Sequence, residues 1–140
     1  MSDFSLFSDT FEEGGEIPKR CGYKFENIRP SLGSKHVPSG TKTSALIIDD
    51  PDAMAAVGKV WVHELSYNNG NTTTIFGTND FGEIGYGGPA PPDGRHTYVF
   101  KLYELDTDLD LKEGFSKQEL EDTMKGHILA EAKLTGTFAS

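Results

Sequence analysis

The stretch from Ile47 to Phe100 decides the fold and carries most of what the sequence says about function. It holds three pieces, in this order: Asp49-Asp50-Pro51-Asp52-Ala53, then Val60-Trp61-Val62-His63, then a glycine- and proline-rich loop that starts at Gly85 and leads to His96 and Tyr98. Acidic residues, two histidines and a loop whose prolines at 89–92 predict a rigid contact surface therefore follow one another closely. We interpret the three pieces as parts of one anion-binding pocket.

Hydrophobic periodicity predicts the strands that carry these pieces. The apolar run Ala45–Ile48 predicts a buried strand that stops at Asp50, because Asp-Asp-Pro interrupts regular structure. Residues 59–67 alternate, which predicts a strand with Trp61, His63 and Leu65 on one face. Residues 96–105 also alternate, with His96, Tyr98, Phe100 and Leu102 together. Residues 81–94, rich in glycine and proline, predict no regular structure.

The remaining segments predict a mostly β chain with one helix near its end. Residues 4–8 suggest a short edge strand, and the stretch to Ser44 predicts irregular loops with one or two short strands. Asn69-Gly70 is a turn signal before a return strand at 72–76. Ser116 and Glu119 form a capping-box pattern. Helical spacing behind it, and a short final strand at 134–138, complete the pattern. The helical spacing runs through Leu120, Met124, Ile128 and Ala132.

Composition limits the classes of partner. A chain of 140 residues that is 36% hydrophobic and 11% aromatic predicts a single domain, residues 1–140, with one core. The net charge of −9 argues against nucleic acid and against docking on anionic lipid, and is typical of a well-solvated surface.

The single cysteine, Cys21, suits a reducing cytoplasm. No apolar run is long enough to span a membrane, and the first eight residues lack a leader pattern, so we expect a cytoplasmic protein without integral membrane association.

The chemistry of the pieces leaves more than one reading open. A histidine on a strand face beside aromatic residues is more often a satisfied core residue than a ligand. With Asp50 and Asp52 close by, we expect the charged form of His63 and His96 to win over burial and to donate hydrogen bonds to an anion. The loop could add backbone N–H groups of Gly87 and Gly88, although plain turn chemistry explains most glycine-rich loops. The three aspartates could equally cap a turn, and the spacing of the histidines gives no support to a metal site.

Enzyme signatures are mostly missing from the sequence. It contains no Gly-x-Ser-x-Gly elbow, no cysteine-protease pattern around Cys21, and no Pro-Cys-x-x-Cys after His63-Glu64. An Asp50–His63 pair could still act as general acid and base. A hydrolase therefore remains the alternative to a binding protein.

In combination, several strings resemble the phosphatidylethanolamine-binding proteins, a family that includes the Raf kinase inhibitor proteins and small bacterial and archaeal members. The resemblance runs from about Phe4 to Phe138. It is carried by Val37–Thr43, by the Asp-Pro-Asp-Ala string at 50–53 and by the Gly-x-His-x-Tyr-Val-Phe string at 94–100, with weaker similarity over residues 22–32. It implies a β-sandwich-like fold of antiparallel sheets with peripheral helices.

The resemblance also implies a function and a site. It implies a pocket for a small phosphate-like anion or a phospholipid headgroup, inhibition of a kinase or serine protease, no cofactor, and a monomer or homodimer. The residues implied for the pocket are Asp50, Asp52, Trp61, His63, Gly88, Pro89, His96 and Tyr98. Three positions depart from the family pattern: Met54 replaces a proline, Glu64 an apolar residue and Thr97 an arginine. The last two lower the positive charge expected near the pocket.

Overall fold

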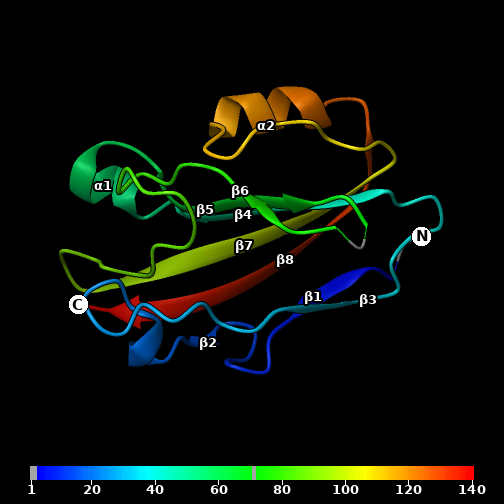
Figure 1. Ribbon diagram of the computed structural model, residues 1–140. Helices are drawn as coiled ribbons and strands as arrows, with labels where there is room; N and C mark the ends of the chain where they lie inside the picture. The colour runs from blue at the N-terminus through cyan, green and yellow to red at the C-terminus, as the bar shows by residue number, and fades with distance from the viewer. Residues whose placement is uncertain (1–2, 71) are drawn as a thin grey trace.

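The computed structural model describes residues 3–70 and 72–140. Residues 1–2, where the stretch predicted to lack a leader pattern begins, lie outside the described residues. Among the described residues a six-stranded sheet has the order β2-β8-β7-β4-β5-β6 (Figure 1). Its strands are β2 (Gly15–Glu16), β4 (Thr43–Asp50), β5 (Trp61–Asn68), β6 (Ile75–Phe76), β7 (Arg95–Leu105) and β8 (Ile128–Ala139). All neighbours in it are antiparallel except the short β2–β8 pair. The mostly β, antiparallel prediction is confirmed.

Each face of the large sheet has its own cover. A two-stranded sheet of β1 (Ser5–Phe7) and β3 (Gly33–Lys35) lies over one face, and α2 (Lys117–Met124) lies over the other (Figure 1). The central strand β4 supplies both sides, because Leu46 and Ile48 join the core with β1 while Ala45 and Ile47 join the core with α2. Burial on both faces explains why this strand reads as a continuous apolar run.

The strand β5 contains an irregularity that the alternating pattern hides. Ile48 pairs with Glu64 but Asp49 pairs with Val62, so His63 is an extra residue in the ladder. As a result Val62 and Leu65, three positions apart, pack in the same core cluster under α2. The prediction that Leu65 shares a face with Trp61 and His63 is therefore wrong. A β-bulge of this kind re-aims a side chain locally, and here that side chain is His63.

The predicted C-terminal helix is too long. The capping box at Ser116 and Glu119 is present in both directions and starts α2, but the helix ends at Met124. Gly126 takes a left-handed φ of 82°, which favours glycine and ends a helix. Residues 128–132, predicted as helix, instead begin β8, which pairs with β7 along its length and includes the predicted final strand at 134–138.

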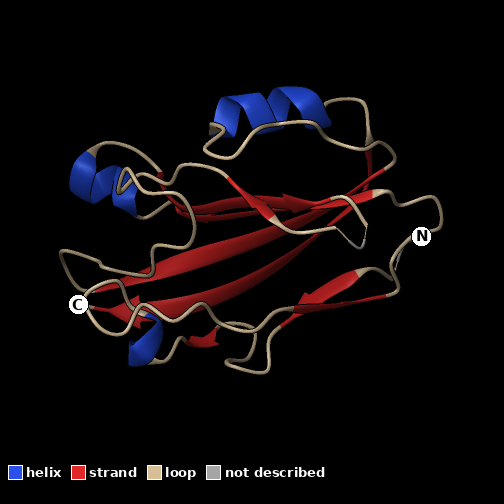
Figure 2. Ribbon diagram, viewed as in Figure 1, coloured by secondary structure: helices blue, strands red, loops and turns tan. Residues whose placement is uncertain are grey.

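Short elements complete the chain. The segment before Ser44 holds β1, β2, β3 and the 3-10 helix η1 (Lys19–Cys21), and the return strand after Asn69-Gly70 is reduced to β6. A five-residue helix, α1 (Ala53–Val57), replaces the turn expected after Asp52. Figure 2 shows these helices at the periphery of the strands. No helix in the described residues has the length and apolarity needed to cross a membrane.

Candidate functional site

The candidate site lies at one end of the large sheet. Asp50 ends β4, Trp61 begins β5, and His96 and Tyr98 lie at the start of β7. Because β4 runs antiparallel to both neighbours, its last residues meet the first residues of β5 and β7. Residues far apart in sequence thus reach one place through strand pairing.

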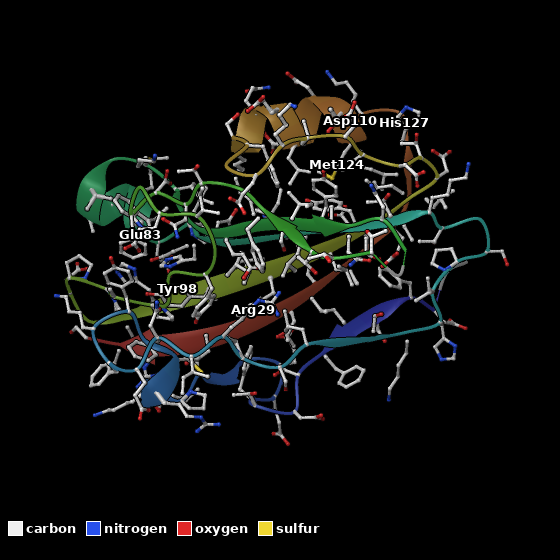
Figure 3. All side chains as sticks on the ribbon, viewed as in Figure 1. Arg29, Glu83, Tyr98, Asp110, Met124 and His127 are labelled. Carbon is white, nitrogen blue, oxygen red and sulfur yellow. The ribbon has the colours of Figure 1, made fainter. Side chains whose placement is uncertain are left out.

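A cavity of about 190 Å³ opens at this end of the sheet. Its walls are mostly apolar and aromatic, with one carboxylate and one imidazole. The lining residues are Asp50, Ala53, Val57, Trp61, His63, Phe81, Ala90, Pro92 and Tyr98. Four of the eight predicted site residues, Asp50, Trp61, His63 and Tyr98, are in this wall. Figure 3 shows Tyr98 at the end of the molecule that carries α1.

The other four predicted residues lie behind the wall or beside it. His96 is buried next to Asp50, while Asp52 is exposed at the start of α1. The Asp52 carboxylate accepts a hydrogen bond from the backbone N–H of Thr97 at 2.8 Å, which ties α1 to β7. Gly88 and Pro89 are buried in the loop. Asp52 therefore has a structural contact of its own, and Thr97, which departs from the family pattern, supplies its backbone donor.

His96 is held between two carboxylates. Its Nδ1 lies 2.6 Å from Oδ2 of Asp50 and its Nε2 lies 3.0 Å from Oδ1 of Asp93. The second Asp50 oxygen accepts from the backbone N–H of Asp52. Burial on its own lowers the pKa of His96, but the hydrogen bonds and negative charges of Asp50 and Asp93 outweigh it, so the pKa is raised above its ordinary value. Both ring nitrogens face carboxylate oxygens, which only accept hydrogen bonds, so this geometry favours the protonated imidazole, whose charge offsets that of Asp50 behind the cavity.

His63 behaves in the opposite way. Its Nδ1 donates to the backbone carbonyl of Gly87 at 2.7 Å, and the rings of Phe81 and Tyr98 meet it edge-on. Burial is the largest influence and lowers the pKa of His63, although Gly87 and Asp50 act the other way. A neutral ring with its proton on Nδ1 leaves Nε2 as an acceptor. The expectation that both rings are charged is therefore wrong for His63.

The glycine loop does not present free backbone donors. The N–H of Gly87 donates to the carbonyl of His63 at 2.9 Å, and the N–H of Gly88 donates to Oδ1 of Asn27 at 2.7 Å. A Cβ on Gly88 would lie 1.9 Å from the carbonyl oxygen of Cys21, so only glycine fits there. The predicted anion nest from these two N–H groups is wrong, because one of them already bonds to β5 and the other to Asn27.

Two polar groups of the cavity residues have no partner. The Trp61 Nε1–H and the Tyr98 hydroxyl are both buried and make no hydrogen bond within the described part of the chain. Asp50 and the Ala90 backbone lie near enough to influence Tyr98 without forming a bond of good geometry. Burial raises the pKa of Tyr98, so its hydroxyl keeps its proton as a donor. Buried donors normally find partners, which makes these two the clearest mark of a missing ligand.

Sequence reasoning missed the contacts that come from distant segments. Arg29 makes a two-pronged ion pair with the fully buried Glu64, at 2.7 and 2.9 Å, and Ser66 donates to the same carboxylate. Glu64 was identified as a departure from the family pattern, but no sequence signal identified its partner. Phe81 also gave no periodic signal. The sequence signal for the second carboxylate at His96 is the position of Asp93 three residues before it, which the predicted site does not include.

Comparisons with known proteins agree on the relationship of this chain. A sequence model described as phosphatidylethanolamine-binding protein matches residues 7–139. A relative from Methanothermobacter thermautotrophicus, named UPF0098 protein, is 41% identical over 96% of this chain and 97% of its own length.

Two crystal structures have the same fold. A phosphatidylethanolamine-binding protein homologue from Chlamydia trachomatis, CT736, aligns with a TM-score of 0.90 and 36% identity, covering 100% of this chain and 99% of its own. YbcL from Escherichia coli, described as a member of the mammalian family, aligns with a TM-score of 0.88 and 26% identity over 98% of both chains.

Proposed function

Because the chain belongs to the phosphatidylethanolamine-binding protein family, we propose that it is a non-catalytic binding protein whose cavity at Trp61 and Tyr98 receives a small phosphate-like group, free or as a phospholipid headgroup. The observation that carries the proposal is a pair of buried donors, Trp61 Nε1–H and the Tyr98 hydroxyl, which have no partner among residues 3–70 and 72–140. Phosphate oxygens are acceptors, and donors that are already desolvated form bonds to charged acceptors at little further cost.

The charges around the cavity limit the kind of anion. The Asp50 carboxylate lies in the cavity wall, and burial lowers the pKa of His63, so this ring adds no positive charge there. The pKa of His96 is raised, and its protonated ring, behind Asp50, offsets the charge of the Asp50 carboxylate. A singly charged anion or a headgroup that carries its own ammonium therefore suits this site better than a free dianion. Phosphoethanolamine combines phosphate acceptors with a cation and is the natural probe.

The proposal is tested by calorimetry with phosphoethanolamine and inorganic phosphate. Tyr98→Phe removes one donor while keeping the ring, and we expect binding to weaken on the order of tenfold, the cost of one charge-assisted hydrogen bond. Tyr103→Phe is the matched control, because Tyr103 lies on the same strand but packs on the α2 face. Equal binding by the wild type and Tyr98→Phe, or no binding at millimolar ligand, contradicts the proposal.

Inhibition of a kinase or serine protease is the wider role we propose for the rim of the same cavity. Pro89 and Pro91 are buried, so Pro92 is the proline of this loop that a partner protein can contact. Together with the exposed Met54 and Val57 of α1 it forms an apolar rim. A preformed rim loses little entropy on docking. Inhibition assays against a panel of serine proteases and kinases test this role, with Val57→Asp expected to abolish any inhibition found.

The alternative of a hydrolase needs an Asp50–His63 pair, and this pair is not hydrogen-bonded. Asp50 bonds to His96, and Nδ1 of His63 bonds to the Gly87 carbonyl. His63 would then act without an orienting carboxylate. Generic phosphatase and esterase substrates decide the matter, because turnover by the wild type that disappears in His63→Ala would overturn the non-catalytic proposal.

A further inference from the structure

A second cavity lies away from the first, between the large sheet and the β1–β3 sheet. It has a volume of about 240 Å³. Its floor is the β1-facing side of β4, β5 and β7, and its roof includes Leu6 and Leu32. Figure 3 shows Arg29 in the space between the large sheet and the N-terminal segment.

The floor changes from apolar to polar along the strands. Strand register places Ser44 between Glu104 and Asn68, and Leu46 between Leu102 and Ser66. Every one of these residues lines the cavity. The result is an aliphatic half beside a patch of serine, asparagine and carboxylate groups.

Glu104 is the unexplained group in this patch. It is 1% exposed, yet among the described residues its partner is one serine hydroxyl, which donates from Ser44 to Oε2 at 2.7 Å. The other oxygen, Oε1, has no donor in the described part of the chain. A buried carboxylate normally has a cation or several donors. Burial raises the pKa of Glu104, as expected for a carboxyl group without a compensating charge.

The neighbouring charges do not supply that compensation. Arg29 is engaged by both oxygens of Glu64, so this pair is neutral as a unit. The hydroxyls of Ser44 and Ser66 already donate to Glu104 and Glu64, so each serine oxygen can take part in a further hydrogen bond only as an acceptor. The patch is therefore rich in acceptors and has one unbalanced acidic group.

We propose that this cavity is a second binding site, which takes a small organic ammonium ion with its charged end at Glu104 and its aliphatic part against Leu46 and Leu102. Three N–H groups of a primary ammonium match Oε1 of Glu104 and the lone pairs of Ser44 and Ser66. The short hydrocarbon chain then covers the aliphatic half of the floor. This site is separate from the phosphate-binding cavity and does not depend on it.

The experiment uses n-butylammonium chloride as the probe and the intact protein. In the wild type, NMR titration should give saturable shifts for residues 44–46 and 102–104, with nuclear Overhauser contacts between the probe methylenes and the methyl groups of Leu46 and Leu102. Glu104→Gln keeps the shape but removes the charge, and we expect binding to weaken on the order of tenfold or more. Glu121→Gln, on the exposed side of α2, removes the same charge elsewhere and should bind as the wild type does.

Three results would overturn the proposal. The first is that no chemical shift saturates at tens of millimolar probe, which means that the cavity holds water alone. The second is that Glu104→Gln binds the probe as tightly as the wild type does. The third is that the probe makes its Overhauser contacts only in the Trp61 cavity. Tyr98→Phe should leave butylammonium binding unchanged, which keeps this test independent of the phosphate proposal. The Overhauser contacts are measured on the wild type, so they decide the matter even if Glu104→Gln does not fold.

Discussion

Removing the guanidinium of Arg29 should destabilise the protein much more than removing an ordinary surface cation. Glu64 is fully buried and takes two of its hydrogen bonds from Arg29, at 2.7 and 2.9 Å. Arg29→Met keeps most of the aliphatic stem but leaves a buried carboxylate whose remaining side-chain donor, within the described residues, is Ser66. The perturbation thus isolates the charge rather than the packing.

The magnitude follows from the burial of the two partners. Breaking a fully buried ion pair costs about 3–5 kcal/mol. The Arg29 side chain is 38% exposed, so water can partly replace it, and we reduce the expected loss in unfolding free energy to about 2 kcal/mol. For a chain of this length that loss lowers Tm by roughly 6 °C.

Urea denaturation followed by circular dichroism measures the loss, and Arg95→Met is the control. Arg95 pairs with Glu16 at 3.4 Å with both side chains about half exposed, so its removal should change the unfolding free energy by less than about 0.5 kcal/mol. In the Arg29→Met background, Glu64→Gln should restore more than half of the lost stability. If Arg29→Met behaves like Arg95→Met, the buried charge is not stabilised by Arg29 and the reasoning fails.

Three further predictions concern buried groups. The raised pKa of His96 means that its contribution to stability is complete below about pH 6.5, the ordinary imidazole value, and is lost as pH rises through its folded pKa. Urea unfolding from pH 5.5 to 8.5 should therefore show that the wild type loses its stability advantage over His96→Gln as pH rises. An advantage that stays constant with pH would contradict this prediction. Gly88→Ala should lose about 3 kcal/mol or fail to fold, because its Cβ meets the Cys21 carbonyl at 1.9 Å; near-wild-type thermal stability would show that the loop can move away. Burial raises the pKa of the Cys21 thiol, so Ellman's reagent should react slowly with the native protein and fast in urea, and equal rates would refute the burial.

The sequence predicted the strands whose apolar and polar side chains alternate cleanly. It predicted the wrong element where the spacing of apolar residues fits both a helix and a strand. Strands β4, β5 and β7 follow from apolar runs and alternation. The segment after α2 was misassigned, because Ile128 and Ala132 fit a helical spacing of four as well as a strand spacing of two. Gly126 adopts a left-handed backbone conformation that ends the helix, and the residues after it are stabilised as a strand by their long pairing with β7.

Of the eight residues that the family resemblance implies for the pocket, the structure brings four together in the cavity wall, and the resemblance does not say how they pair. Asp50, Trp61, His63 and Tyr98 meet because antiparallel register brings the end of β4 to the starts of β5 and β7. The bulge at His63 leaves no periodic signal, since one added residue resembles ordinary alternation on either side. Position 88 likewise requires glycine because the Cys21 carbonyl lies against it. Cys21 is distant in the sequence, so no local pattern around residue 88 predicts this contact.

The most direct test of the central claim uses the single tryptophan as a reporter of the cavity. Its indole N–H gives one isolated NMR signal, and phosphoethanolamine is titrated into the wild type and into Tyr98→Phe while this signal is followed. If Trp61 Nε1–H is a donor waiting for a phosphate oxygen, the signal should shift downfield and saturate, at higher ligand concentration in Tyr98→Phe. An indole signal that stays fixed at tens of millimolar phosphoethanolamine would contradict a phosphate-binding cavity at this end of the sheet.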